Sequence, residues 1–205
     1  MGTMKKPTVS LFRRMKNEGR KITMLTAYDA PTAKLAQECG IDIILVGDSL
    51  GMAVLGYQNT LPVTLEQSLH HCAAVRRGAP DAFVIGDMPF MTCHASETDA
   101  LKNAARYLQE AQCDAVKIEG DAALAPTVER MVHAGIPVMG HIGLLPQHIK
   151  TSGVYRVTGR KEEEAERIIA DAKAMEAAGV FAMVLECMPA ELGKQITEAV
   201  SVPTI

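Results

Sequence analysis

The stretch Ile41-Asp-Ile-Ile-Leu-Val-Gly-Asp48 is an apolar run, rich in Ile and Val, that ends on a carboxylate. Such a run, bounded by glycine, is typical of a buried β-strand. The same pattern returns in Ala82-Phe-Val-Ile-Gly-Asp87, Asp114-Ala-Val-Lys-Ile-Glu119, Pro137-Val-Met-Gly-His141 and Val180-Phe-Ala-Met-Val-Leu-Glu186. Burying an unpaired charge is costly, so core packing does not explain these polar ends. Five of them predict one polar site where parallel strands terminate.

Helical patterns separate the apolar stretches. The sequence predicts strands at 22–27, 41–47, 82–87, 115–119, 137–141 and 180–187 and the start of a seventh at 202–205. It predicts helices at 8–17, 31–39, 64–77, 96–111, 123–134, 162–178 and 189–200. The segment 48–62 is long and largely aperiodic and is predicted to be a functional loop, and 143–160 is predicted to be a second long loop.

This alternation predicts a parallel α/β domain, either an open doubly wound sheet or a (β/α)8 TIM barrel. The barrel is favoured because no G-x-G-x-x-G follows the first strand. A barrel also presents every strand end to one mouth, which suits five polar ends. We therefore expect residues 1–205 to form a single barrel domain that lacks its last strands, because the chain stops as strand seven begins.

Composition restricts the class of protein. A net charge of -3 argues against a general nucleic-acid binder. The 5 cysteines are odd in number and show no C-x-x-C spacing, as expected of reduced thiols in a cytosolic protein. No apolar run is long enough to span a bilayer, and the basic N-terminus lacks the apolar region of a signal peptide. We expect a cytoplasmic protein without membrane or nucleic-acid partners.

Asp48 and Asp87 end neighbouring predicted strands. Two such carboxylates repel each other unless a cation or a proton lies between them. A hard cation such as Mg2+ is the natural partner, and Glu119 would lie beside the pair. The alternative is that each aspartate caps the loop or helix that follows it.

Lys117 and Glu119 lie two residues apart and therefore share one face of their strand. Inside a barrel they would form a buried ion pair, or a clamp for a substrate carboxylate beside a metal-binding carboxylate. On a surface strand the alternation would be trivial. His141 either contacts substrate or is structural. Glu186 follows an apolar run, so we expect desolvation to raise its pKa, as suits a general base. The alternative for Glu186 is a salt bridge to Lys117.

Eight motifs, taken together, resemble the 3-methyl-2-oxobutanoate hydroxymethyltransferase (ketopantoate hydroxymethyltransferase) family. The resemblance extends from about residue 7 to residue 205. The motifs are Thr26-Ala-Tyr-Asp29, Val46-Gly-Asp-Ser-Leu-Gly51, Gly56-Tyr-Gln-Asn-Thr-Leu-Pro-Val-Thr64, Arg76-Arg-Gly-Ala-Pro80, Gly86-Asp-Met-Pro-Phe90, Val116-Lys-Ile-Glu-Gly120, Gly140-His-Ile-Gly-Leu144 and Leu185-Glu-Cys187.

The resemblance implies a barrel of the phosphoenolpyruvate/pyruvate superfamily and a pathway role in pantothenate and coenzyme A biosynthesis. The implied reaction is hydroxymethyl transfer from 5,10-methylenetetrahydrofolate to 3-methyl-2-oxobutanoate, giving 2-dehydropantoate through a Mg2+-stabilised enolate. By position, the resemblance implies that Glu186 is the proton acceptor. It also implies metal carboxylates at Asp48, Asp87 and Glu119, and substrate contacts at Asp48, Ser49, Asp87, Lys117 and His141.

The resemblance further implies a homo-oligomer, commonly a decamer, and a longer chain with an eighth βα unit. Two alternatives stay open at this point. One is another Mg2+-dependent lyase of small 2-oxo acids in the same superfamily, although the expected loop cysteine motif is not found. The other is a truncated, non-catalytic chain that binds ligand or assembles with full-length subunits.

Overall fold

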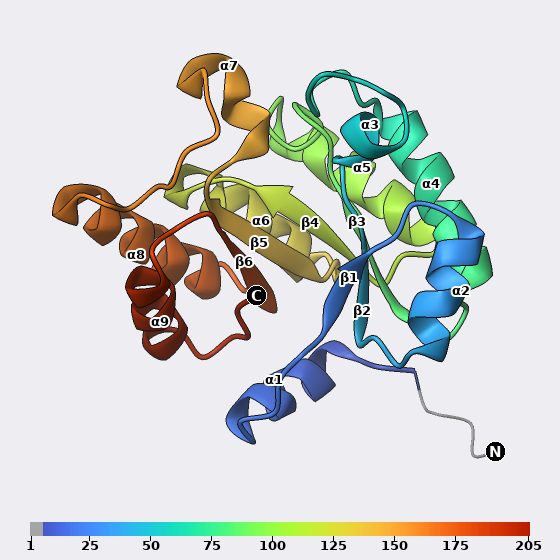
Figure 1. Ribbon diagram of the computed structural model, residues 1–205, viewed down its shortest axis with the longest axis horizontal. Coiled ribbons are helices and arrows are strands. Elements are labelled where there is room, and N and C mark those ends of the chain that lie inside the picture. Colours follow the sequence, from blue (N-terminus) through green and yellow to red (C-terminus); the bar gives the residue numbers. More distant parts are fainter. Residues whose placement is uncertain (1–5) are drawn as a thin grey trace.

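Strand and helix alternate throughout residues 6–205, the part of the chain that the computed structural model describes (Figure 1). The predicted domain spans residues 1–205, and its residues 1–5 lie outside the described residues. The six strands are β1 (Met24–Thr26), β2 (Ile43–Val46), β3 (Phe83–Asp87), β4 (Ala115–Glu119), β5 (Val138–Gly143) and β6 (Ala182–Glu186).

All the strand pairs are parallel, and the strands follow the order β1-β2-β3-β4-β5-β6 across the sheet. Each strand therefore lies beside its neighbour in sequence. This is the order of a (β/α) barrel, whereas a doubly wound sheet reverses its order at a switch point. The barrel prediction is confirmed, and the open doubly wound alternative is wrong.

The helices follow the predicted boundaries to within a few residues, except in the two long loops. Hydrogen-bonded caps start several of them: Thr64 and Gln67 form a reciprocal capping box at the start of α4. The elements are α1 (Val9–Asn17), α2 (Ala30–Glu38), α3 (Leu50–Ala53), α4 (Leu65–Gly78), α5 (Glu97–Gln109), η1 (Ala122–Leu124), α6 (Ala125–His133), η2 (Pro146–His148), α7 (Ile149–Ser152), α8 (Glu162–Ala177) and α9 (Ala190–Ala199). The two predicted loops contain short helical turns that the sequence did not predict, namely α3, η2 and α7.

Helix α1 covers the amino ends of the strands. Its Phe12 is buried against Phe83 of β3, with ring centroids 4.9 Å apart in an edge-to-face arrangement. Its Lys16 ammonium donates to the backbone carbonyls of Thr197, Val200 and Val202 at 2.9, 2.8 and 2.7 Å. In Figure 1, α1 lies at the bottom, and α3 and α7 lie at the opposite, carboxyl end of the sheet. Because α1 covers the amino ends of the strands, a functional site is expected at their carboxyl ends.

The predicted seventh strand begins where the sequence places it. Thr204 forms a parallel bridge with Met183 of β6, and the backbone N–H of Leu185 donates to the carbonyl of Ile205 at 2.8 Å. Within the described part of the chain, no helix has the length and apolar character needed to cross a membrane.

Candidate functional site

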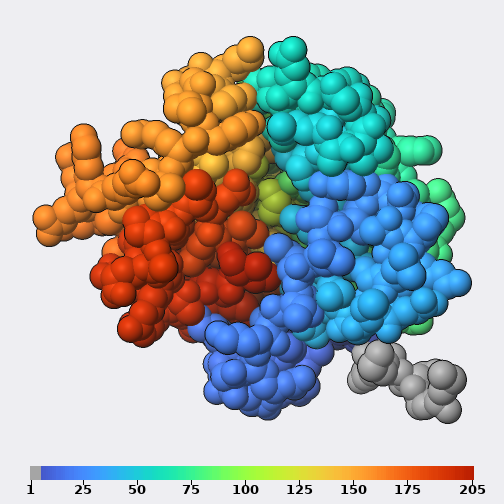
Figure 2. All heavy atoms as spheres, in the orientation of Figure 1, coloured from blue at the N-terminus to red at the C-terminus, as the bar shows by residue number. Residues whose placement is uncertain are grey.

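A cavity of about 410 Å³ lies at the carboxyl ends of the strands, and all seven predicted site residues line it. Figure 2 shows the molecule hollowed between the blue segment that contains β1 and the red segment that contains β6 and α9. The predicted residues come from five strand ends because parallel strands terminate at the same edge. They are Asp48, Ser49, Asp87, Lys117, Glu119, His141 and Glu186.

Three carboxylates, of Asp48, Asp87 and Glu119, form the buried wall of this cavity and are each 2–3% exposed. The backbone N–H of Asp48 donates to Asp87 Oδ2 at 3.0 Å, which ties the end of β2 to the end of β3. Neither aspartate caps the helix that follows it, because Ser49 is the cap residue of α3 and Ser96 is the cap residue of α5.

Lys117 supplies the positive charge among these acids. Its Nζ lies 2.6 Å from Asp87 Oδ1 and 3.8 Å from Glu119 Oε1, and its side chain is 5% exposed. Burial lowers the pKa of Lys117, but the surrounding carboxylates outweigh burial and raise it, so the ammonium stays charged. The surface-strand alternative is wrong, and Lys117 forms a buried ion pair.

Asp48 keeps a proton at neutral pH when no metal is bound. Burial, first, and repulsion by Asp87, second, raise the pKa of Asp48 from its ordinary value of 3.8 to about 8. One ammonium therefore does not balance three buried carboxylates. A divalent cation would supply the missing positive charge.

This raised pKa predicts a pH dependence of stability. Between about pH 4 and pH 8 the folded chain binds a proton on Asp48 that the unfolded chain releases, so the free energy of unfolding falls as pH rises through that window. The side chain in Asp48→Asn cannot ionise, so this variant should be more stable than the wild type at pH 8. The difference should be a few kcal/mol, because one pKa unit corresponds to ~1.4 kcal/mol. Near pH 4 the two should unfold alike.

Urea unfolding of the metal-free proteins across this pH range measures the difference. The matched control is Asp81→Asn, because Asp81 is exposed in the turn before β3. The control should follow the wild-type curve. A pH slope that is the same in Asp48→Asn and in the wild type would contradict the assignment of the proton to Asp48.

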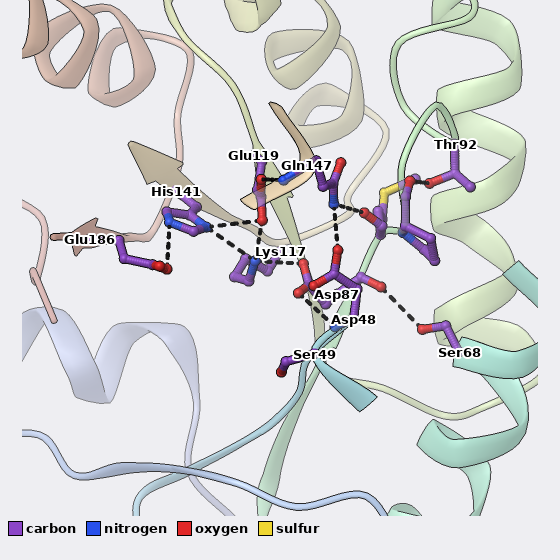
Figure 3. A network of polar contacts seen from close by, with 12 residues as sticks. Asp48, Ser49, Ser68, Asp87, Thr92, Lys117, Glu119, His141, Gln147 and Glu186 are labelled. Carbon is purple, nitrogen blue, oxygen red and sulfur yellow. Dashed lines mark hydrogen bonds and ion pairs between the residues drawn. The ribbon is translucent and has the colours of Figure 1, made fainter. Parts of the chain in front are cut away.

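His141 and Glu186 lie together at one side of the cavity, where His141 is buried and Glu186 is partly exposed (Figure 3). His141 Nε2 lies 3.1 Å from Glu186 Oε2, and His141 Nδ1 lies 3.5 Å from Glu119 Oε1. Burial and Lys117 lower the pKa of His141, but its hydrogen bonds to Glu119 and Glu186 outweigh them and raise it above the ordinary value. The pair thus approaches an imidazolium held between two carboxylates.

The expected desolvation of Glu186 is wrong, and so is the alternative of a salt bridge to Lys117. The Glu186 side chain is 39% exposed, so the apolar run before it does not desolvate it. Its ionic partner is His141 and not Lys117, whose ammonium contacts Asp87 and Glu119 instead. An exposed carboxylate at the rim of a cavity remains able to accept a proton from a bound molecule.

Ser49 lies at the opposite wall, where Tyr28 OH is 2.8 Å from its Oγ. A Cβ at Gly47 would lie 2.7 Å from Ser49 Oγ, so a side chain at that position would displace this hydroxyl. Tyr28 was not singled out from the sequence as a candidate for the site. Only its place in the Thr26–Asp29 motif pointed to this region.

Two further sets of contacts were also missed by sequence reasoning. Tyr107 OH and Ser68 Oγ both donate to the backbone carbonyl of Asp87, at 2.8 and 3.1 Å, and so fix the end of β3 from the helix side. Gln147 of η2 donates from Nε2 to Asp48 Oδ2 and from its backbone N–H to Glu119 Oε2, both at 3.0 Å. Neither set of contacts has a signal in local sequence periodicity.

The oxygen donors of this wall suit a hard cation chemically. The buried carboxylates of Asp48, Asp87 and Glu119 outnumber the single ammonium, and Mg2+ prefers such ligands. Within residues 6–205, however, no three acidic, imidazole or thiol side chains are already arranged around a metal position. Lys117 lies between Asp87 and Glu119, so the carboxylates line one cavity without forming a closed metal cage.

Residues 6–205 match the family model described as ketopantoate hydroxymethyltransferase. The chain belongs to this family. It is 55% identical over 193 residues to the 3-methyl-2-oxobutanoate hydroxymethyltransferase of Thermoanaerobacter sp. (strain X514), a match that covers 94% of this chain and 70% of that protein. The enzyme of the same name from Desulfotalea psychrophila (strain LSv54 / DSM 12343) is 54% identical over 202 residues, covering 98% of this chain and 72% of that protein.

Solved structures share the fold of this ketopantoate hydroxymethyltransferase family member. A 2,3-dimethylmalate lyase, described as a PEP mutase/isocitrate lyase superfamily member, has a TM-score of 0.70 at 17% identity, over 96% of this chain and 70% of the other. Phosphonopyruvate hydrolase, solved in complex with oxalate and Mg++, has a TM-score of 0.67 at 14% identity, over 97% and 80%. At these identities the likeness shows the fold alone, and it agrees with the predicted (β/α) barrel.

Proposed function

We propose that this chain transfers a hydroxymethyl group from 5,10-methylenetetrahydrofolate to 3-methyl-2-oxobutanoate, giving 2-dehydropantoate. Family membership supports the reaction, since the relatives carry the name 3-methyl-2-oxobutanoate hydroxymethyltransferase. The observation that carries the proposal is the pairing of His141 with Glu186 at the rim of a cavity whose wall is charged and buried. That arrangement combines a base with a place for an anionic 2-oxo acid.

Binding comes first. The ammonium of Lys117 and the hydroxyl of Ser49 both face the cavity and suit the carboxylate of a 2-oxo acid. Asp48, Asp87 and Glu119 would hold Mg2+, which supplies Lewis acidity to the negative charge that develops on the substrate's keto oxygen. Burial of these groups keeps bulk water away and strengthens each charge–charge contact.

Proton removal follows at the rim. Glu186 Oε2 lies 3.1 Å from His141 Nε2, so the imidazole orients the carboxylate toward the cavity. Glu186 takes the proton from C3 of the 2-oxo acid, and the electron pair of the C3–H bond becomes that of the enolate. The enolate carbon would then bond to the methylene carbon of the folate, and both bonds from that carbon to the folate nitrogens would break. Water would supply the hydroxyl group, and the proton held by Glu186 and the proton from water would go to the two nitrogens, which releases tetrahydrofolate.

The first half of this reaction can be observed without folate. Proton NMR of 3-methyl-2-oxobutanoate in D2O, with the protein and Mg2+, should show loss of the C3 proton signal. EDTA should stop the loss, because the enolate would then lack its stabilising cation. A folded protein that exchanges no C3 proton with Mg2+ present, or that exchanges it equally in EDTA, would sink the proposed mechanism.

A further inference from the structure

Gln147 is buried, with 3% exposure. Its hydrogen bonds reach two of the three buried carboxylates and the backbone carbonyl of Met88, the residue after Asp87. Its Nε2 donates to Asp48 Oδ2 and to the carbonyl of Met88, both at 3.0 Å. Its backbone N–H donates to Glu119 Oε2, also at 3.0 Å. One residue therefore joins the ends of β2 and β4 and the residue after β3 (Figure 3).

The orientation of this amide follows from its partners. Asp48 Oδ2 and the Met88 carbonyl are both acceptors, so the amide must turn its nitrogen toward them. Figure 3 shows the amide oxygen pointing away from Asp48. That oxygen, Oε1, is buried and has no hydrogen-bond partner among the described residues. A side chain chosen only for packing would not leave a buried acceptor unpaired, since methionine fills a similar volume without a polar atom.

We propose that Gln147 is a positioning residue of the cation site. It occupies one oxygen of Asp48 and one oxygen of Glu119, and so directs the second oxygen of each carboxylate toward a divalent cation in the cavity. Glu119 Oε1 does lie on the cavity side, within 3.5 Å of His141 Nδ1. The inference rests on the proposed function, which places Mg2+ among these carboxylates. Groups that orient metal ligands in this way typically contribute 10- to 100-fold, roughly, to metal affinity.

Gln147→Met tests the proposal through metal binding itself. The probe is Mn2+ titrated into the full chain, with free Mn2+ followed by its electron paramagnetic resonance signal. The expected result is binding weaker than in the wild type by about 10- to 100-fold. Saturating Mn2+ should then restore much of the C3 proton exchange, because the variant lacks only the means to orient the carboxylates. A general folding defect would not be rescued by added Mn2+.

The matched control is Gln37→Met in α2. Gln37 also uses its amide, accepting from the backbone N–H of Asp81 at 2.9 Å, but it does not line the cavity. Its Mn2+ affinity should equal that of the wild type. Should Gln147→Met fail to fold, Gln147→Asn replaces it, since the shorter amide cannot span Asp48 and Met88 and should also weaken Mn2+ binding.

Two outcomes would overturn the inference, and they are distinct. If the wild type binds Mn2+ and the folded Gln147 variants bind it with the same affinity to within about two-fold, the metal site stands and only the role of Gln147 is removed. Absence of Mn2+ binding in the wild type would remove the proposed cation site, and the inference with it.

Discussion

Glu186→Gln should slow C3 proton exchange of 3-methyl-2-oxobutanoate by about 10²- to 10⁴-fold, the range that a positioned general base contributes. Glutamine keeps the shape of the side chain and its contact with His141, but its amide does not accept a proton at neutral pH. Because Glu186 is 39% exposed and the buried His141 keeps Glu119 as its second partner at 3.5 Å, the substitution leaves no buried charge unpaired. The fold should therefore be retained. Proton NMR in D2O with saturating Mg2+ measures the exchange.

The matched control for this substitution is Glu191→Gln. Glu191 is an exposed glutamate in the first turn of α9, the helix that follows β6. Exchange in this variant should equal that of the wild type. If Glu186→Gln keeps more than about a tenth of wild-type exchange, which is well outside the expected loss, then another group removes the proton. His141 would be the next residue to replace.

Among the substitutions proposed for this chain, Lys117→Met should produce the largest fall in the free energy of unfolding of the metal-free protein. The ammonium lies 2.6 Å from Asp87 Oδ1 and 3.8 Å from Glu119 Oε1, among three buried carboxylates. Removing one partner of a buried ion pair costs about 3–5 kcal/mol, because the remaining charge is left uncompensated. The loss should grow as pH rises above about 4, since the folded variant must retain carboxylate protons that the unfolded chain releases. Urea unfolding at several pH values measures it.

Lys34→Met is the control for the loss of a lysine. Lys34 is exposed on α2, and its ammonium is 3.9 Å from Glu38, a surface pair. Such pairs contribute at most about 1 kcal/mol, so this variant should unfold nearly as the wild type does at every pH. An equal loss of stability at pH 5 and pH 8 in Lys117→Met would show that its effect comes from packing and not from charge.

The part of the fold that sequence predicts best is the part set by local patterns. Strand β4 was predicted at its observed bounds, since an acidic residue precedes it and glycine follows it. Parallel strands end at a common edge, so polar strand ends were sufficient to predict a shared cavity. The seven predicted residues do line it, although their chemical roles stay predictions.

Long-range contacts account for what sequence reasoning missed. Helix α3 forms where Gly51 packs so closely that a Cβ would lie 2.6 Å from Val63, a contact with no periodic signal. Gln147 lies 99 positions from Asp48, its main partner, so only the folded chain brings the amide to the carboxylate. The side chain of Glu186 is 39% exposed although it ends an apolar strand, and an apolar run does not reveal this exposure.

The order of the strands has a consequence for folding kinetics. Each strand pairs with the one before it, so every new pairing closes a loop of one βα unit and costs a similar, modest entropy. The contacts of Lys16 with Thr197, Val200 and Val202 are different, because they join positions 181 to 186 residues apart. Distant pairings slow folding when they belong to the nucleus. The strands can thus assemble stepwise from local contacts, and the docking of α1 against α9 becomes a late, locking event of the pathway.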